Sequence, residues 1–213
     1  MQVKSAQIIS IKKLKKDGSF GTDIIQRIIE ALLNNQNVLM PIDNVYGIAG
    51  LNLNDLQERF SFDNTTNHDH MECLISSFRM LDDIADYSKS DYDFLNRIWP
   101  GEVSVVFNCK NGLKKKKPLK VRYPKTRFFQ YVVEEINKPL YYLPALKDFN
   151  KPVYKKSELI KYYGDRADCM VLIDELCKKH PLPTLIDIKD GKLMILHEGK
   201  ISSDEIKSLY FLG

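Results

Sequence analysis

The spacing of hydrophobic residues changes several times along the chain, and each change predicts a different element. Residues 7–14 alternate well enough to predict a first strand. Apolar residues at 24, 25, 28, 29, 32 and 33 then form the stripe of a one-sided helix, with Thr22 or Ser19 expected as its N-cap. The apolar run of residues 38–40 predicts a buried strand, which opens onto the polar stretch Pro41-Ile42-Asp43-Asn44.

The rest of the chain continues this mixture of helical and strand spacing. We expect helices in residues 52–60, 81–99, 126–137 and 157–163 and after Ser202, and strands in residues 73–78, 103–107, 120–124, 139–146 and 169–173. Residues 183–201 predict a β-hairpin turned by Lys189-Asp190-Gly191. Irregular alternation of strands and helices predicts an α/β or α+β fold with a mixed, twisted sheet. Because no linker or internal repeat divides the chain, a single domain over residues 1–213 is expected.

Composition narrows the class of protein without identifying it. The chain has 213 residues, of which 44% are hydrophobic, so one substantial core is expected. The net charge of +4 permits an anionic partner but does not require one. No apolar run approaches the roughly 18 residues that span a membrane, and the N-terminal residues lack the pattern of a secretory signal. We therefore expect a cytoplasmic protein without a membrane partner, in which the scattered cysteines are reduced structural thiols: Cys73, Cys109, Cys169 and Cys177.

A basic segment is the strongest charge feature of the sequence. Arg122 stands in an otherwise apolar strand and must find an anion, which could be a ligand carboxylate, a phosphate or a structural Asp or Glu. Together with Tyr123 and Phe128, the basic residues of this segment could instead hold a nucleic-acid backbone. The residues predicted to do so are Lys114, Lys115, Lys116, Lys117 and Arg127.

Two polar stretches have both a structural and a functional interpretation. Asp43 and Asn44 could serve a ligand site at a strand end, or simply cap and turn the backbone. His68, Asp69 and His70 carry metal-ligand chemistry, but their spacing in a polar loop is not specific, and no metal site is expected. Spacing alone predicts no Ser/His/Asp triad, glycine-rich phosphate loop or paired-carboxylate site.

Four segments, in the same order, resemble motifs of the YrdC-like family, whose members make L-threonylcarbamoyladenylate. VLMPIDNVYGIAGLNLND resembles the family stretch PTDTVYGLGCD, and RIWPGEVSVVF is similar to FWPGPLTLVL. KVRYP resembles VRVP, and PLPTLIDIKDGKLMILHEGKI resembles a closing motif of the form PSTVVDL…G…ILRPGAI. The resemblance covers about residues 8–206. It implies a single YrdC-like domain, with a twisted mixed sheet, helices on both sides and a concave basic cavity.

The resemblance also implies a nucleotidyltransferase reaction. Family members condense threonine, bicarbonate and ATP, with Mg²⁺, and release pyrophosphate. Their product serves the threonylcarbamoyladenosine modification of tRNA. Arg122 would hold the threonine carboxylate, and the implied pocket for threonine and nucleotide consists of Asp43, Asn44, Tyr46, Ser104, Arg122, Thr184 and His197.

Several positions of this sequence depart from the family motifs. Ile42 and Asn44 replace the two threonines of PTDT, and residues 64–70 lack the family's Lys-x-Arg. The Ser-Ala-Asn signature aligns with Pro144-Ala145-Leu146, and His197 replaces an arginine. Two expectations follow: a diverged synthase-like enzyme, or a non-catalytic module of the same fold that binds double-stranded RNA, tRNA or a nucleotide.

Overall fold

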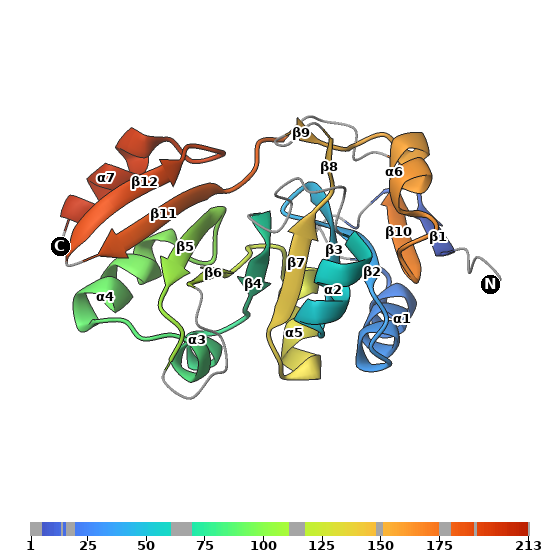
Figure 1. Cartoon of the computed structure of the whole chain (residues 1–213), viewed down its shortest axis with the longest axis horizontal. Helices are drawn as coiled ribbons and strands as arrows, with labels where there is room; N and C mark the ends of the chain where they lie inside the picture. Colours follow the sequence, from blue (N-terminus) through green and yellow to red (C-terminus); the bar gives the residue numbers. More distant parts are fainter. Residues whose placement is uncertain are drawn as a thin grey trace. The chain divides into compact units, whose positions relative to one another are not determined.

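The structure is a computed structural model that describes residues 6–13, 15, 20–60, 70–110, 118–147, 151–174, 180–189 and 191–212. The chain divides into two compact units (Figure 1). Unit 1 comprises Met1–Met71 and Thr126–His180, and unit 2 comprises Glu72–Lys125 and Pro181–Gly213. The first segment of unit 2 is therefore inserted between the two segments of unit 1. The division into two units does not test the expectation of one domain over residues 1–213, which stays a prediction.

Unit 1 contains a mixed sheet with strand order β1-β10-β2-β3-β7. β1, β10 and β2 run parallel to one another, whereas β3 is antiparallel to both of its neighbours. The elements of unit 1 are β1 (Gln7–Ile11), α1 (Thr22–Leu33), β2 (Val38–Ile42), β3 (Val45–Gly50), α2 (Leu53–Phe60), α5 (Arg127–Ile136), β7 (Leu140–Pro144), β8 (Leu146–Lys147), β9 (Lys151–Pro152), α6 (Lys156–Tyr163) and β10 (Cys169–Ile173).

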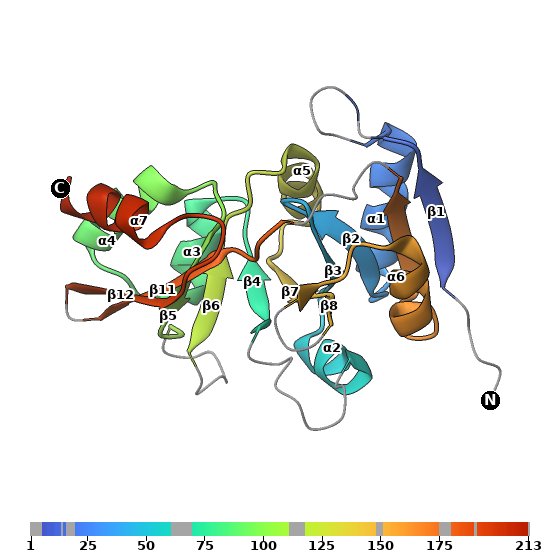
Figure 2. The ribbon, with the colours of Figure 1, turned by 90° about the horizontal axis from the view of Figure 1, so that it is seen from above.

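Helices cover both faces of the unit 1 sheet, α1 and α5 on one side and α2 and α6 on the other (Figure 2). The apolar stripe predicted for residues 24–33 is the buried side of α1. The rings of Phe20 and Phe128 meet beside it, with centroids 4.1 Å apart. On the opposite face, Leu56 of α2 and Leu159 of α6 enter one cluster with the strand side chains. The burial of both faces explains why β2 and β3 are apolar at nearly every position.

The strands of unit 2 follow one another in the order β4-β6-β5-β11-β12, with parallel and antiparallel pairs. Its helices lie on one side of these strands in Figure 2. Arg97 of α4 donates from Nη1 to the carbonyl of Leu209 in α7 at 3.0 Å, which fixes the two helices side by side. The elements of unit 2 are β4 (Glu72–Leu74), α3 (Phe78–Ile84), α4 (Lys89–Ile98), β5 (Val103–Phe107), β6 (Leu119–Arg122), β11 (Thr184–Lys189), β12 (Lys192–His197) and α7 (Ser203–Phe211).

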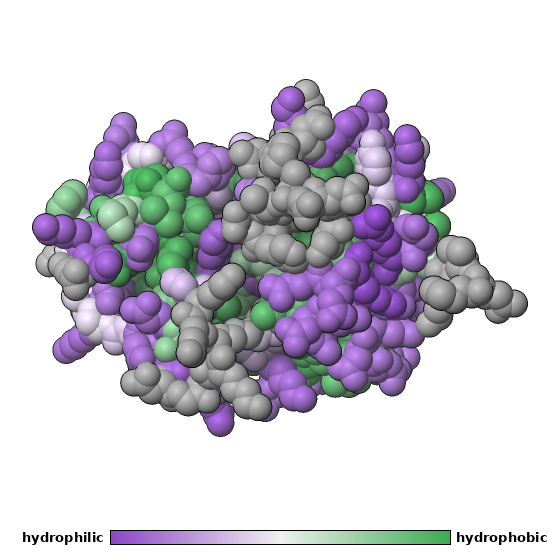
Figure 3. Space-filling view, viewed as in Figure 1, coloured by the Kyte–Doolittle hydropathy of each residue, from purple (hydrophilic) through white to green (hydrophobic). Residues whose placement is uncertain are grey.

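Hydrophobic surface gathers over β11 and β12 on the face of unit 2 seen in Figure 3. In β12, the side chains of Met194 and Leu196 are 42% and 52% exposed. They alternate along the strand with the half-buried Leu193 and Ile195. The hairpin that the sequence predicts over residues 183–201 is confirmed by the antiparallel pairing of β11 and β12.

The predicted class, an α/β fold with a mixed sheet and helices, is confirmed. Three local predictions were wrong. The first strand ends at Ile11, the N-cap of α1 is Gly21 rather than Thr22 or Ser19, and residues 81–99 are not one helix. α3 ends at Ile84, and Ser88 starts α4 with a capping box in which its side chain and that of Asp91 exchange backbone hydrogen bonds. The concave basic cavity that the resemblance implies stays a prediction.

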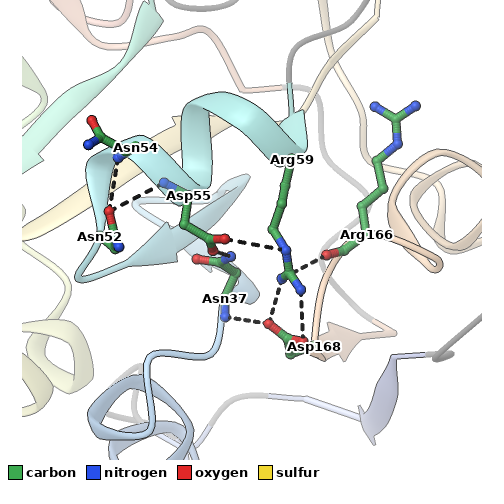
Figure 4. A network of polar contacts seen from close by, with 7 residues as sticks. All are labelled: Asn37, Asn52, Asn54, Asp55, Arg59, Arg166 and Asp168. Carbon is green, nitrogen blue, oxygen red and sulfur yellow. Dashed lines mark hydrogen bonds and ion pairs between the residues drawn. The ribbon is translucent and has the colours of Figure 1, made fainter.

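A polar network holds the amino-terminal ends of β2 and β10 to α2 (Figure 4). Asp168, just before β10, accepts from the backbone N–H of Asn37 at 2.9 Å and from Nη1 of Arg59 at 2.7 Å. The Asn37 side chain donates in turn to Asp55. Because these groups join three elements that are distant in sequence, they fix the start of β10 and the start of β2, the strand that leads to the β2–β3 turn.

The cysteines of the described residues, Cys73, Cys109 and Cys169, form no disulfide. Burial raises the pKa of the Cys169 thiol, which favours its neutral, unreactive form. Cys177 lies outside the described residues. Within the described ranges, no helix has the length and apolar character needed to cross a membrane.

Candidate functional site

The polar stretch after β2 is a two-residue hairpin turn. Asp43 and Asn44 have φ angles of +48° and +66°, and they connect the antiparallel strands β2 and β3. Two central residues with positive φ are the pattern of a type I′ turn, which matches the twist of the strands that it joins. Asp and Asn tolerate this backbone region better than most residues. The change from apolar to polar residues is therefore explained by the turn itself.

Asp43 is anchored to the start of α5 by a residue that the sequence did not single out, Thr126. Its Oδ1 accepts hydrogen bonds from the Thr126 backbone at 3.1 Å and from Oγ1 at 2.6 Å. The backbone N–H of Asp43 donates to Thr126 Oγ1 at 2.9 Å. Asp43 is buried, whereas Asn44 and Arg127 are exposed on either side of this contact. The structure thus brings three of the predicted residues together around one threonine.

Tyr46 belongs to the core of unit 1. Its side chain is completely buried, and its hydroxyl accepts a hydrogen bond of 2.9 Å from the backbone N–H of Ile173, at the end of β10. The next residue, Gly47, lies directly against the ring of Tyr142, whose hydroxyl donates to the carbonyl of Val45 at 2.7 Å. The Tyr-Gly pair of the motif is thereby explained by packing: the tyrosine fills the core, and the glycine leaves room for a second ring.

Ser104 and Arg122 meet in unit 2 on a carboxylate, that of Glu72. Oε2 of Glu72 accepts a hydrogen bond from Arg122 Nε at 3.0 Å and forms an ion pair with Nη2 at 2.9 Å, while Oε1 accepts from the hydroxyl of Ser104. The Arg122 side chain is 1% exposed and that of Glu72 is 9% exposed. Of the anions that the sequence left open for Arg122, the structure shows a structural Glu. Glu72 was missed because a single acid before an apolar run gives no sign of its partner 50 residues away.

Thr184 and His197 lie at the same end of the β11–β12 hairpin, away from its turn, because His197 pairs with Leu185, the residue after Thr184. Thr184 is buried, and its Oγ1 donates to the carbonyl of Ile201 at 2.5 Å while it accepts from the N–H groups of Gly199 and Ile201. It therefore fastens the turn that precedes α7. β11 runs parallel to β5, so Thr184 lies opposite Val103, next to Ser104. His197 is the exposed last residue of β12.

Some predicted residues fall outside the part of the chain that the structure describes. These are Lys114, Lys115, Lys116, Lys117, His68 and Asp69. Among the described residues, no group of three or more His, Cys, Asp or Glu side chains could hold a metal. The predicted binding roles of the pocket residues stay predictions. What the structure adds is that Asp43, Tyr46, Ser104, Arg122 and Thr184 each have an internal hydrogen-bond partner.

A family comparison matches most of the sequence. The sequence profile of the Sua5/YciO/YrdC family, described as telomere recombination, matches residues 30–199. No protein in the curated set matches the sequence significantly.

Solved structures show the same fold at low sequence identity. Escherichia coli YciO has a TM-score of 0.79 and 13% identity, over 94% of this chain and 98% of that one. P. abyssi Sua5 complexed with L-threonine has a TM-score of 0.77 and 16% identity, over 95% of this chain and 60% of that one. Full-length HypF in a phosphate- and nucleotide-bound form has a TM-score of 0.68 and 14% identity, over 83% and 29%. The present chain thus spans less than two thirds of the Sua5 and HypF structures.

Proposed function

The chain belongs to the Sua5/YciO/YrdC family, and from this premise we propose that it is a diverged L-threonylcarbamoyladenylate synthase-like protein that works in the cytoplasm. In the proposed reaction, the amino group of threonine and bicarbonate give a carbamate and water, and a carbamate oxygen then attacks the α-phosphate of ATP and displaces pyrophosphate. The product would serve tRNA modification. One observation carries the proposal: Arg122 and Ser104, which the resemblance assigns to the threonine pocket, converge on the two oxygens of one carboxylate.

The reaction requires charge screening, because an anionic carbamate must approach a polyanion. Positioning and cationic groups lower such a barrier without a covalent nucleophile. Since no described cluster of three acidic, histidine or cysteine side chains fits a metal, Mg²⁺ would arrive bound to the phosphates of ATP and to water. His197 and the lysines of residues 114–117 are the groups that we place toward the phosphates.

Purified full-length chain should release pyrophosphate from Mg-ATP only when both L-threonine and bicarbonate are present. The sequence lacks at least two phosphate-facing cations of the family motifs. If each such contact contributes about 2–4 kcal/mol in the transition state, the rate should be about 10³- to 10⁶-fold below that of a synthase that retains them. The measurement is coupled pyrophosphate detection together with chromatography of the adenylate.

Two matched serine-to-alanine variants distinguish the loss of a hydroxyl at the proposed site from the loss of a hydroxyl elsewhere on the protein. Ser104→Ala removes the hydroxyl beside Arg122 and should reduce turnover, whereas Ser157→Ala removes an exposed hydroxyl of α6 and should leave it unchanged. Pyrophosphate release that is the same with and without threonine would contradict the proposed reaction.

The Glu72 contact also favours a second candidate function, a non-catalytic module that binds double-stranded RNA, tRNA or a nucleotide. A cation already paired with an internal carboxylate contributes less to an incoming anionic substrate. RNA binding would then use Arg127, exposed at the start of α5, and the lysines of residues 114–117.

Fluorescence anisotropy with a duplex RNA tests this second function. Five phosphate contacts should weaken binding about 10²- to 10³-fold between 50 and 200 mM salt. Changing the four lysines 114–117 to glutamine should reduce that salt dependence, whereas the same change at four exposed lysines elsewhere should have a smaller effect: Lys89, Lys138, Lys200 and Lys207. Affinity that does not change with salt would exclude this interface.

A further inference from the structure

Arg122 and Ser104 form a binding site for a carboxylate, here called the receptor, and the side chain of Glu72 occupies it. A guanidinium that meets one oxygen with a hydrogen bond from Nε and an ion pair from Nη2, and a hydroxyl that donates to the other oxygen, satisfy both ends of a carboxylate. The guanidinium is buried and held on β6, while Ser104 is held on the neighbouring strand β5. The geometry of the receptor therefore depends on the sheet rather than on Glu72.

We propose that Glu72 is an internal ligand that occupies this receptor in the resting protein and excludes external carboxylates from it. Only the identity of the external ligand, the carboxylate of L-threonine, rests on the proposed function. The self-occupied receptor itself follows from the contacts of Glu72, Ser104 and Arg122. An external carboxylate binds there when the carboxylate of Glu72 has left.

The position of Glu72 suits a side chain that can be displaced. It is the first residue of β4, a strand of three residues, and the paired positions that hold β4 to β6 are Cys73 with Val121 and Leu74 with Arg122. Withdrawal of Glu72 therefore moves the end of a strand without changing this register. The barrier is electrostatic, because a displaced Glu72 must find another partner or reach water.

Glu102 provides a matched comparison within unit 2. It is also a buried glutamate, but its ion-pair partner, Lys125, has a side chain that is 54% exposed. Removal of Glu102 leaves a lysine that water can solvate, whereas removal of Glu72 leaves a buried guanidinium and a cavity of carboxylate shape beside it. A small carboxylate should therefore rescue only the second variant.

The experiment is thermal unfolding of Glu72→Ala in formate or acetate, compared with chloride at equal ionic strength. Formate should raise the Tm of Glu72→Ala by about 3–5 °C for each tenfold excess over its Kd. The wild-type protein, Glu102→Ala and the double variant Glu72→Ala/Arg122→Ala should show no shift beyond that in chloride. Equal formate shifts in Glu72→Ala and the double variant, or no shift in Glu72→Ala, would overturn the proposal.

A second variant keeps the test decisive if Glu72→Ala does not fold. Glu72→Gln keeps the volume of the side chain and removes the charge of the Glu72 carboxylate beside Arg122, so isothermal titration should show L-threonine binding to it at least tenfold more tightly than to the wild-type protein. L-threoninamide, which lacks the carboxylate, should show no such gain. Equal L-threonine affinities in both proteins would overturn the proposal. If formate rescues Glu72→Ala but threonine binds neither protein, the receptor stands and the proposed function fails.

Discussion

Replacing Arg122 with alanine should lower the free energy of unfolding by about 3–5 kcal/mol, more than any other single change considered for this chain. The substitution leaves the carboxylate of Glu72 buried without the guanidinium that forms a hydrogen bond and an ion pair with it. Breaking a buried pair by removing one partner has an effect of this size, because an uncompensated charge stays out of water. Urea denaturation followed by circular dichroism measures it, at constant m-value.

Two controls separate the buried charge from the loss of a salt bridge as such. Lys147→Ala breaks an exposed pair, Lys147 with Glu158, and should change stability by less than about 0.5 kcal/mol. The apolar combination Arg122→Met/Glu72→Leu/Ser104→Ala removes all three polar groups and should lie near the wild-type stability. A loss below about 1 kcal/mol in Arg122→Ala would show that Glu72 finds another partner or water.

Gly47→Ala should lower the free energy of unfolding by about 3 kcal/mol, at the upper end of the usual range for overpacking a core. A Cβ at Gly47 would approach the ring and hydroxyl of Tyr142 more closely than real Cβ atoms do. The ring cannot withdraw freely, because it is buried and its hydroxyl is bonded to Val45. Thermal or urea unfolding of the variant gives the value.

The clash between a Cβ at position 47 and the ring of Tyr142 predicts that the stability effects of substitutions at these two positions are not additive. Tyr142→Leu shortens the side chain in the way, so the double variant Gly47→Ala/Tyr142→Leu should be more stable than the sum of the two single effects predicts. Gly191→Ala is the matched control: its φ of +69° is strained for alanine, but nothing lies within 4 Å, and about 1 kcal/mol is expected. Strict additivity would mean that the ring of Tyr142 does not restrict position 47.

Elements with a clear period or a short apolar run were predictable, but the hairpin formed by two fully buried strands, β2 and β3, was not. The stripe of α1 identifies a helix with one buried side, and the Lys189-Asp190-Gly191 turn between two apolar runs identifies the β11–β12 hairpin. β3 is buried at every position, so its sequence carries no alternation, and the hairpin that it forms with β2 was missed. The break between α3 and α4 had a local signal, the capping pair of Ser88 and Asp91, which the helical spacing around it concealed.

The candidate site was predictable in its residue types and not in its contacts. The requirement of Arg122 for an anion follows from its apolar neighbours, but the choice of Glu72 depends on two strands separated by 50 residues. In the same way, Asp43 needs a donor within reach, and Thr126 supplies it from 83 residues away. Long-range pairing of this kind leaves no periodic trace in a single sequence.

The left-handed backbone of the β2–β3 turn restricts which residues can evolve there. Thr is β-branched and would be strained at position 44, where φ is +66°. Asn is among the non-glycine residues that adopt a positive φ most often. Replacing Asn44 with the threonine of the family motif would therefore strain the backbone of the turn. Variation at positions 43 and 44 among descendants of this chain should follow backbone handedness, with Gly, Asn and Asp exchanging for one another, whatever molecule the protein handles.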